Sequence, residues 1–290
     1  MTDATAQTAD WSRLGILAGG GDLPLELAQA RQDENPFIVQ LSGFVDRDYS
    51  GFETTSHAVG QIGAIIKSLQ AAGCDAICFA GYVTRPDFSA LKMDGRGLSL
   101  LPKALAAGRK GDDALIRVIV EAFEKEGFRV VGADQVKAAL IPAAAGDAMG
   151  VPSDAHAADI AKAAHVARQM GALDIGQAAV VANGLVLAVE AQEGTKVMLE
   201  RIAALPAELR GSAEARCGVL AKMPKPIQER RVDLPTIGLE TIEACAKAGL
   251  AGIVLESGGA IILEREALQS ALMKHGLFIT IVEPAEADHG

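Results

Sequence analysis

The chain has 290 residues and a formal net charge of −10 at pH 7, and half of its residues are hydrophobic although only 4% are aromatic. This length is enough for two domains of ordinary size, and the apolar share can bury a substantial core. The acidic balance argues against a nucleic-acid partner, because phosphate contacts require clustered lysine and arginine, and against docking on anionic lipid by charge alone.

The N-terminal segment and the cysteines favour a cytoplasmic protein. Residues 1–10 are polar and acidic, without the basic and apolar regions of a signal peptide. No apolar run reaches the roughly 20 residues that a transmembrane helix needs. The cysteines lie in apolar segments and form no C-x-x-C pair, which is typical of reduced core thiols; they are Cys74, Cys78, Cys217 and Cys245.

The first half of the chain alternates apolar runs with stretches of helical spacing. Apolar runs predict strands at Leu14–Ala18, Phe37–Leu41, Ala76–Ala80 and Phe128–Val131. Helical spacing predicts helices at Leu23–Arg31, Ile62–Ala72 and Asp112–Glu126. Strands that alternate with helices favour a parallel sheet joined by right-handed crossovers, so we predict an α/β domain over residues 1–142.

The second half has a different pattern, after a stretch rich in Ala, Gly and Pro at 143–153 that we predict to be a linker. Two apolar runs joined by Asn183-Gly184 predict a hairpin, since a type I′ turn needs positive φ at both central residues. Strands are predicted at Ala178–Ala182, Leu185–Val189, Cys217–Ala221, Gly252–Leu255, Ala260–Leu263 and Phe278–Val282. Helices are predicted at Asp154–Met170, Thr195–Ala204, Leu239–Ala248 and Arg265–Lys274. A mixed α/β domain is therefore expected over residues 154–290.

A glycine-rich turn, Gly19-Gly20-Gly21-Asp22, follows the first predicted strand. Its N–H groups and the helix start behind it can hold a phosphate, but a tight turn without a ligand is an equally good interpretation. Pro24 replaces the third glycine of the dinucleotide-binding fingerprint, and no acid ends the next strand. An NAD(P)-dependent oxidoreductase is therefore disfavoured.

Two cations of the first half stand beside predicted elements. Arg85 lies in the loop after the third strand, where open α/β sheets bind ligands, and it can bind a phosphate or pair with Asp87. Lys110 precedes the third helix and can also reach a phosphate. The start of that helix is predicted to be capped by Asp112 or Asp113.

Two acids of the second half stand at predicted strand ends. Glu190 follows the second strand of the hairpin, shortly before Thr195, and Glu256 precedes a glycine turn. Each is a candidate metal ligand, and each can instead be a polar residue that caps a turn or helix.

The segment 222–238 combines four cations, two acids and three prolines between a predicted strand and a predicted helix. Such a loop is stiff, and its Lys and Arg residues can neutralise a diphosphate. Asp233 stands between Val232 and Leu234, an apolar setting that a solvated loop acid would not need. The alternative is a salt-bridged loop in which Asp233 pairs with Arg230 or Arg231. We favour the functional interpretation.

Taken together, these segments resemble the UDP-2,3-diacylglucosamine pyrophosphatase family of the LpxI type, over nearly the whole chain. The resemblance is carried by GILAGGGDLP, AGYVTRPDF, GRKGDDALIR, EGFRVVGA, LDIGQAAVV, AVEAQEGT, KMPKPIQERRVDLPTIG and TIEACAKAGLAGIVLESG. It implies an N-terminal Rossmann-like domain and a distinct C-terminal catalytic α/β domain. It also implies hydrolysis of UDP-2,3-diacylglucosamine to UMP and 2,3-diacylglucosamine 1-phosphate, a step of lipid A synthesis, by water attack on the α-phosphorus.

The resemblance and the residue chemistry lead to specific site predictions. The predicted catalytic residues are Asp233, Arg231 and Gln228; the substrate-binding residues are Gly20, Gly21, Asp22, Arg85, Lys110, Thr195, Lys225 and Arg230; the metal ligands are Asp233, Glu190 and Glu256. Because these ligands are carboxylates, Mg²⁺ or Mn²⁺ is expected rather than Zn²⁺. The lipidic substrate implies transient contact with the inner membrane surface, and a homodimer is compatible with the sequence.

Two positions depart from the family pattern. Lys196 stands where aspartate is expected, which affects the metal role of the preceding acids, and Ile227 stands where glycine is expected. The alternative function is a non-catalytic sensor that binds a nucleotide sugar or another small ligand. Metal-dependent turnover would distinguish the enzyme from such a sensor.

Overall fold

The computed structural model describes residues 10–84, 91–142, 147–226 and 228–284. The chain forms two compact units: residues 1–138 with 229–232, and residues 139–228 with 233–290. The short segment Glu229–Val232 thus belongs to the first unit, although the residues on both sides of it belong to the second.

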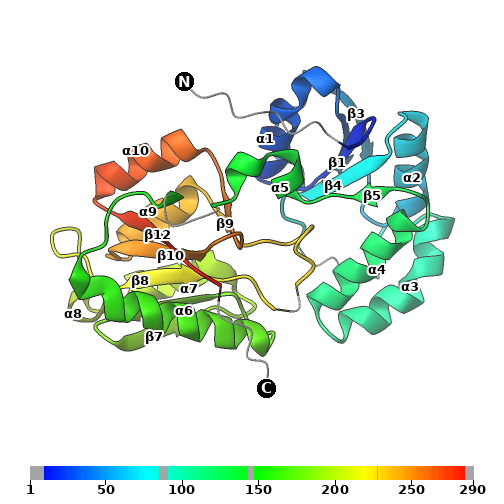
Figure 1. The fold of residues 1–290 in the computed structure, drawn as a ribbon. Coiled ribbons are helices and arrows are strands. Elements are labelled where there is room, and N and C mark those ends of the chain that lie inside the picture. The colour runs from blue at the N-terminus through cyan, green and yellow to red at the C-terminus, as the bar shows by residue number, and fades with distance from the viewer. Residues whose placement is uncertain (1–9, 85–90, 143–146, 227, 285–290) are drawn as a thin grey trace. The chain divides into compact units, whose positions relative to one another are not determined.

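The first unit is built on a parallel five-stranded sheet with the order β3-β2-β1-β4-β5 (Figure 1). Its strands are β1 (Leu14–Ala18), β2 (Phe37–Leu41), β3 (Glu53–His57), β4 (Ala76–Ala80) and β5 (Arg129–Val130). Its helices are α1 (Leu23–Ala30), α2 (Ile62–Ala71), α3 (Gly95–Gly108), α4 (Asp112–Glu124) and α5 (Ala133–Val136). This Rossmann-like order confirms the predicted α/β class.

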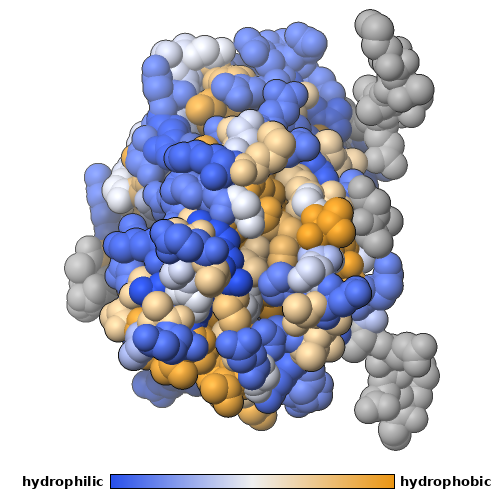
Figure 2. Space-filling model, turned by 90° about the vertical axis from the view of Figure 1, so that its left-hand side faces the viewer, coloured by the Kyte–Doolittle hydropathy of each residue, from blue (hydrophilic) through white to orange (hydrophobic). Residues whose placement is uncertain are grey.

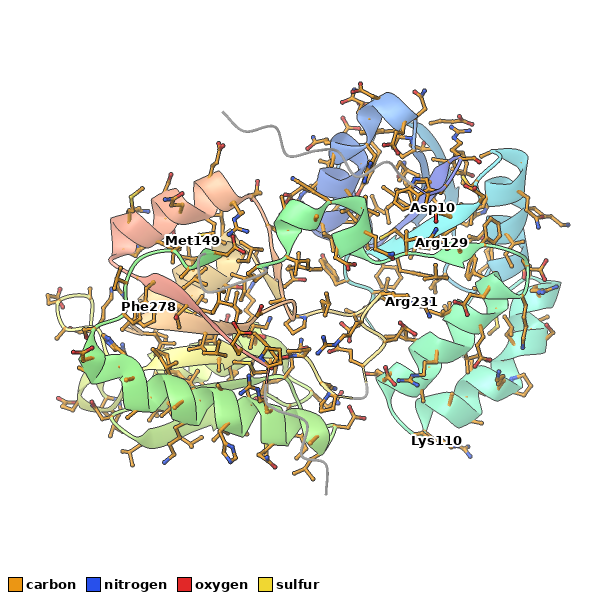
Figure 3. The ribbon with its side chains drawn as sticks, viewed as in Figure 1. Asp10, Lys110, Arg129, Met149, Arg231 and Phe278 are labelled. Carbon is orange, nitrogen blue, oxygen red and sulfur yellow. The ribbon has the colours of Figure 1, made fainter. Side chains whose placement is uncertain are left out.

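Asp10, just before β1, forms an ion pair of 2.8 Å with Arg129 of β5 (Figure 3).

Besides the four-residue helix α5, one strand and one longer helix of the first unit were not predicted. Strand β3 has the sequence ETTSH and lies at the edge of the sheet, so it lacks the apolar run that indicates a buried strand. Helix α3 contains several glycines and Pro102, which favour a loop. Its start is stabilised by Asp94, whose side chain accepts hydrogen bonds from the N–H groups of Gly97 and Ala64 at 2.8 Å.

The second unit contains a mixed five-stranded sheet with the order β12-β10-β8-β6-β7. Its strands are β6 (Ala178–Ala182), β7 (Leu185–Val189), β8 (Val219–Lys222), β10 (Gly252–Glu256) and β12 (Phe278–Val282), and β9 (Thr236–Ile237) pairs with β11 (Ile261–Ile262) in a small second sheet. Its helices are α6 (Ala157–Ala172), α7 (Gly194–Ala203), α8 (Ala207–Arg210), α9 (Leu239–Lys247) and α10 (Arg265–His275). Short 3₁₀ turns occupy Gln32–Glu34, Ala138–Leu140 and Asp154–His156. The mixed α/β class predicted for this half is confirmed.

Two hydrophobic clusters cover the two faces of this second sheet. Buried residues of α7, α9 and α10 pack on one face together with Leu220 and Ile253. Helix α6 packs on the other face, against Val219 and Val254 (Figure 1). Because neighbouring residues of a strand point to opposite faces, each strand contributes to both clusters.

The hairpin between β6 and β7 forms where the sequence predicts it. Asn183 and Gly184 have φ values of 50° and 76°, so both central residues are left-handed, as a type I′ turn requires. The buried carboxylate of Asp159, on α6, accepts hydrogen bonds from the backbone N–H groups of Asn183 at 2.8 Å and Gly184 at 2.7 Å. This side chain fixes the turn to the helix.

Asp159→Ala is expected to lower the free energy of unfolding by about 1–3 kcal/mol, because it leaves the two N–H groups of the turn without their acceptor. Denaturant unfolding followed by circular dichroism measures this change. Asp154→Ala removes an exposed aspartate of the same unit and serves as the control. Equal stability of the two variants would contradict the role of Asp159.

The residues around the predicted linker belong to the second unit. Positions 143–146 lie outside the described residues. After them, Met149 forms a bridge with Ile279 of β12 through two backbone hydrogen bonds of 2.9 and 2.7 Å. No helix among the described residues is long and apolar enough to cross a membrane.

Candidate active site

Buried polar side chains gather at one edge of the second sheet, where β8 and β10 end. Strand β8 ends at Lys222 and β10 at Glu256, and Glu190 directly follows β7. Four polar or charged side chains of this region are buried, namely Glu190 (6% exposed), Lys222 (6%), Gln228 (7%) and Glu256 (5%). Among the described residues, the other buried one is Asp159, which binds the β6–β7 turn at the opposite edge of the sheet. Burying charged groups is costly unless they are paired, so a cluster of this kind indicates a functional edge.

Lys222 is the buried cation at the end of β8. Its ammonium donates a hydrogen bond to the carbonyl oxygen of Thr236 at 3.1 Å. Burial lowers the pKa of Lys222, and the negative charges of Glu190 and Asp233 oppose this shift. Lys222 was not among the predicted site residues. The sequence could have indicated it, because a lysine directly follows the apolar run Cys217–Ala221.

Glu190 is held from two sides. Its carboxylate accepts hydrogen bonds from the hydroxyl of Thr195 at 2.7 Å and from the backbone N–H of Gln177 at 3.3 Å. Gly176 packs so closely that a Cβ atom there would lie 2.1 Å from the carbonyl oxygen of Glu190. Thr195 therefore orients Glu190 in this structure. Lys196, the departure from the family pattern, is exposed on α7.

Glu256 is paired with a different partner. The guanidinium of Arg168, on α6, lies 2.9–3.0 Å from a carboxylate oxygen of Glu256 and also donates to the carbonyl oxygen of Glu283 at 2.6 Å. Glu256 and Lys222 lie on opposite faces of the sheet, because successive side chains of a strand point to opposite faces. Leu255 packs on the face covered by α9, so Glu256 points toward α6, whereas Ala221 packs on the α6 face, so Lys222 points the other way.

The three predicted metal ligands therefore do not come together in the second unit. Glu190 is bound to Thr195 of α7, whereas Glu256 is bound to Arg168 of α6, on the other face of the sheet. Within the described part of the chain, no group of three or more His, Cys, Asp and Glu side chains is placed to hold a metal ion. The second unit can offer two carboxylates, Glu190 and Asp233. Mg²⁺ commonly uses one or two carboxylates together with phosphate oxygens of a substrate, so this donor set fits an ion of that kind.

Three more predicted site residues, Lys225, Gln228 and Arg230, lie in the proline-rich loop after β8. Lys225 forms an ion pair of 2.8 Å with Asp174, which precedes β6. The side-chain oxygen of Gln228 accepts a hydrogen bond from the backbone N–H of Lys225 at 3.0 Å, but its buried amide nitrogen has no hydrogen-bond partner. A buried donor of this kind is suited to a ligand oxygen. Arg230 is exposed, and Ile227 lies outside the described residues.

Arg231 belongs to the first unit and is held there by acids. The guanidinium of Arg231, which is labelled in Figure 3, donates hydrogen bonds of 2.8 Å to Glu229 and to Glu124, and these bonds raise the pKa of Arg231. The backbone N–H of Glu229 donates to Asp113 of α4 at 2.7 Å. The expected capping of α4 by Asp112 or Asp113 is wrong, because the N-cap is Gly111. In this structure Arg231 thus fixes the loop segment that precedes Asp233.

The glycine-rich turn of the first unit binds an internal carboxylate. The N–H of Gly19 donates to the carbonyl oxygen of Ala80, at the end of β4, and that of Gly20 to the carbonyl oxygen of Tyr82, just after it. The N–H of Gly21 donates to the carboxylate of Asp46 at 2.9 Å. This bond to Gly21 is the largest cause that lowers the pKa of Asp46. Asp22 forms an ion pair of 2.5 Å with Arg47. The turn therefore has the chemistry to bind an anion, and a phosphate at Gly21 would have to displace Asp46.

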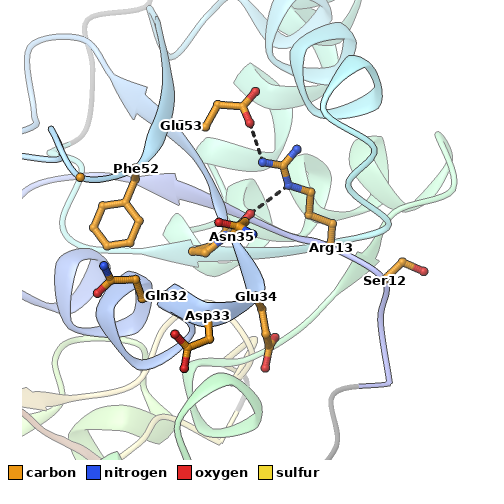
Figure 4. Close-up of a pocket in the computed structure, with 10 residues that line it drawn as sticks. Ser12, Arg13, Gln32, Asp33, Glu34, Asn35, Phe52 and Glu53 are labelled. Carbon is orange, nitrogen blue, oxygen red and sulfur yellow. Dashed lines mark hydrogen bonds and ion pairs between the residues drawn. The ribbon is translucent and has the colours of Figure 1, made fainter.

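Two predicted substrate ligands of the first unit remain. Arg85 lies outside the described residues, and Lys110 is exposed beside the start of α4 (Figure 3). A pocket of about 810 Å³ lies instead at the amino ends of β1 to β3 (Figure 4). Its Arg13 is bound to Glu53 at 2.6 Å and to the carbonyl oxygen of Asn35 at 2.9 Å. Open α/β sheets bind ligands at the carboxyl ends of their strands, so we do not assign the function to this pocket.

Comparisons with known proteins cover nearly the whole chain. Residues 13–140 match the model of the LpxI N-terminal domain, and residues 145–280 match that of the LpxI C-terminal domain. A curated relative, the UDP-2,3-diacylglucosamine pyrophosphatase LpxI of Caulobacter vibrioides, is 51% identical over 276 residues, which cover 94% of this chain and 99% of that protein. A solved structure, CobK precorrin-6A reductase, covers 94% of this chain and 88% of its own at 15% identity, with a TM-score of 0.32, which is too low to show a shared fold.

Proposed function

This chain belongs to the LpxI family, and from that premise we propose that it hydrolyses UDP-2,3-diacylglucosamine to UMP and 2,3-diacylglucosamine 1-phosphate in lipid A synthesis. The observation that carries the proposal is the 51% identity to the Caulobacter enzyme over almost the full length of both chains. The buried polar edge of the second sheet supports it, because a diphosphate requires several charged groups at one place.

In the proposed reaction, water attacks the α-phosphorus, next to uridine, and the lipid phosphate leaves. Asp233 orients the water and accepts its proton as the new P–O bond forms. Gln228 donates its unpartnered amide N–H to a phosphate oxygen. Lys225 and Arg230 neutralise the phosphates, Lys225 by exchanging Asp174 for the substrate. Arg231 acts through the loop that it holds.

We further propose that the reaction needs Mg²⁺ or Mn²⁺, with Asp233 and Glu190 as the carboxylates that hold the ion. When bound, such an ion supplies positive charge that polarises the P–O bonds of the diphosphate. Thr195 keeps a Glu190 oxygen in place through its 2.7 Å hydrogen bond. Glu256, bound to Arg168, stays outside this arrangement unless that ion pair opens.

The test of this function is the release of UMP from UDP-2,3-diacylglucosamine by the purified full-length chain with Mg²⁺ or Mn²⁺. A non-catalytic sensor would bind the nucleotide sugar and release no UMP. Enzymatic turnover that depends on protein concentration is the expected result. Absence of UMP from a folded, substrate-binding protein would reject the proposal.

The position of attack gives a separate prediction. If the reaction is carried out in water enriched in oxygen-18, the label is expected in UMP, because the α-phosphorus receives the water oxygen. Mass spectrometry of both products measures it. Label in 2,3-diacylglucosamine 1-phosphate instead would show attack on the other phosphorus, with the same products but a different geometry.

We also propose that the protein works in the cytoplasm and contacts the inner membrane surface transiently, because its proposed substrate carries two acyl chains. Hydrophilic side chains dominate the face in Figure 2 but leave apolar ones between them. Exposed large apolar residues of the second unit include Leu173, Leu185 and Met273. Cell fractionation is expected to release the protein from membranes at high salt or in carbonate. Retention through both washes would contradict transient contact.

A further inference from the structure

The topological switch point of the first sheet lies between β1 and β4. The chain runs from β1 outward to β2 and β3, and then crosses to β4 and β5 on the other side of β1. Open α/β sheets bind ligands outside the carboxyl ends of the strands that flank such a point. The segments that follow these ends are the glycine-rich turn after Ala18 and residues 81–84 after Ala80.

Glycines allow these two segments to approach each other closely. Tyr82 forms a β-bridge with Gly20 through two backbone hydrogen bonds of 2.9 Å. A Cβ atom at Gly19 would lie 2.5 Å from the carbonyl oxygen of Tyr82, and one at Gly20 would lie 2.4 Å from Cζ of the tyrosine ring. The contact with Tyr82 therefore requires glycine at both positions, and the ring lies against the turn.

The ring of Tyr82 is held in place and yet accessible. Its hydroxyl donates a hydrogen bond to one carboxylate oxygen of Asp46 at 3.2 Å, and the other oxygen accepts the N–H of Gly21 at 2.9 Å. Tyr82 is nevertheless 56% exposed. A fixed aromatic ring at a ligand-binding edge is suited to stack on a planar ligand, because little side-chain freedom is lost on binding.

Charged groups surround the hydroxyl end of this ring. The guanidinium of Arg47 forms ion pairs with Asp46 at 3.5 Å and with Asp22 at 2.5 Å. An acyl chain gains nothing from such neighbours. A nucleobase offers a ring face for stacking and an edge of N–H and carbonyl groups for polar partners. The chemistry of this place therefore favours a base over a lipid chain.

We propose that Tyr82 is the stacking platform for the base of a nucleotide, which in the proposed substrate is uracil. The inference rests on the proposed function for the identity of the base, and it concerns recognition of the nucleotide rather than the hydrolysis. Asp46 stays bound to Gly21 in this arrangement and keeps the ring oriented. The glycine-rich turn then contributes to binding through the tyrosine that it supports.

The test is a magnetic resonance titration of the full-length protein with carbon-13-labelled tyrosine rings, and the probe is UMP. The chain has two tyrosines, and Tyr49 is only 2% exposed, so its signal is the internal control. The signals of Tyr82, assigned with Tyr82→Phe, are expected to shift and to show nuclear Overhauser effects to the ring protons of uracil. Ribose 5-phosphate, which has no base, is expected to leave them unchanged.

Tyr82→Leu is the diagnostic variant for affinity, because leucine keeps an apolar contact and removes the aromatic ring. Calorimetry is expected to show at least about fivefold weaker binding of UMP, the lower end for loss of a stacked aromatic side chain. Binding of ribose 5-phosphate is expected to stay unchanged, and Tyr82→Phe to stay close to the wild type. Leu98→Ala removes a side chain of the same unit that is 57% exposed, and is the matched control.

Thermal unfolding shows whether each variant is folded. The proposal is overturned if the wild type does not bind UMP, if bound UMP leaves the Tyr82 signals unchanged, or if folded Tyr82→Leu binds UMP as tightly as the wild type. Equal losses for UMP and ribose 5-phosphate would also contradict it, because they indicate a structural effect. If Tyr82→Leu does not fold, the titration of the wild type still decides.

UMP release from UDP-2,3-diacylglucosamine is measured in parallel, so that the two proposals can fail separately. Release of UMP by a protein whose Tyr82 does not respond to the base rejects only this inference. The expected response of Tyr82 without any release of UMP rejects only the proposed reaction.

Discussion

Replacing Asp233 by alanine is expected to lower kcat at least about 10²-fold while KM stays close to the wild-type value, since this is the range for loss of a general base. The residue is half-buried, directly after the segment that the first unit holds through Arg231, and its charge acts on Lys222 at the sheet edge. An acid that accepts the proton of the attacking water stabilises mainly the transition state. Binding of the anionic substrate in the ground state does not require it.

Steady-state kinetics of Asp233→Ala and Asp233→Asn, with thermal unfolding of both, measure this effect. Glu240→Ala removes an exposed acid of α9 and is the control. Because Lys222 loses one counter-charge in either Asp233 variant, a fall in stability has to be separated from a fall in kcat. A folded Asp233→Ala variant with nearly normal kcat would show that another acid carries the reaction, with Glu190 or Glu256 as the next candidates.

Removal of divalent cations is the second change with a large expected effect. After treatment with a chelator and gel filtration, turnover of UDP-2,3-diacylglucosamine is expected to fall at least about 10²-fold, because the reaction then loses the divalent positive charge that stabilises the developing negative charge at the diphosphate. Addition of Mg²⁺ or Mn²⁺ is expected to restore it, since carboxylates and phosphates are hard oxygen ligands. Thermal unfolding before and after chelation is the control for structural damage. Undiminished turnover in excess chelator would refute the metal requirement.

The secondary structure of this protein could be predicted wherever the pattern of apolar residues in the sequence matches the residues that the fold buries. The buried strands β1, β2, β4, β6, β10 and β12 consist mostly of apolar residues, and the hairpin follows from Asn183-Gly184. The pattern failed at β3, because an edge strand does not need apolar residues, and at α3, because Asp94 and tertiary packing outweigh a proline and several glycines.

Site residues were predictable as chemical types but not as neighbours. The sequence by itself determined that carboxylates stand at strand ends and that cations crowd the loop 222–238. It could not show that Glu256 and Lys222 point to opposite faces of one sheet. That result depends on the register of β8 against β10, in which Lys222 pairs with Leu255, and a shift of one residue would reverse the faces.

Only the tertiary structure decided which partner each charge has. Arg231 and Asp233 are two positions apart in the chain, yet Arg231 is held in the first unit by Glu124, while Asp233 belongs to the second unit. Asp46 binds the N–H of Gly21, 25 residues earlier in the chain. Local sequence determines backbone preference and burial through the nearest neighbours, whereas ion pairs join groups that only the folded chain brings within a few ångströms, so they follow from topology and register rather than from spacing.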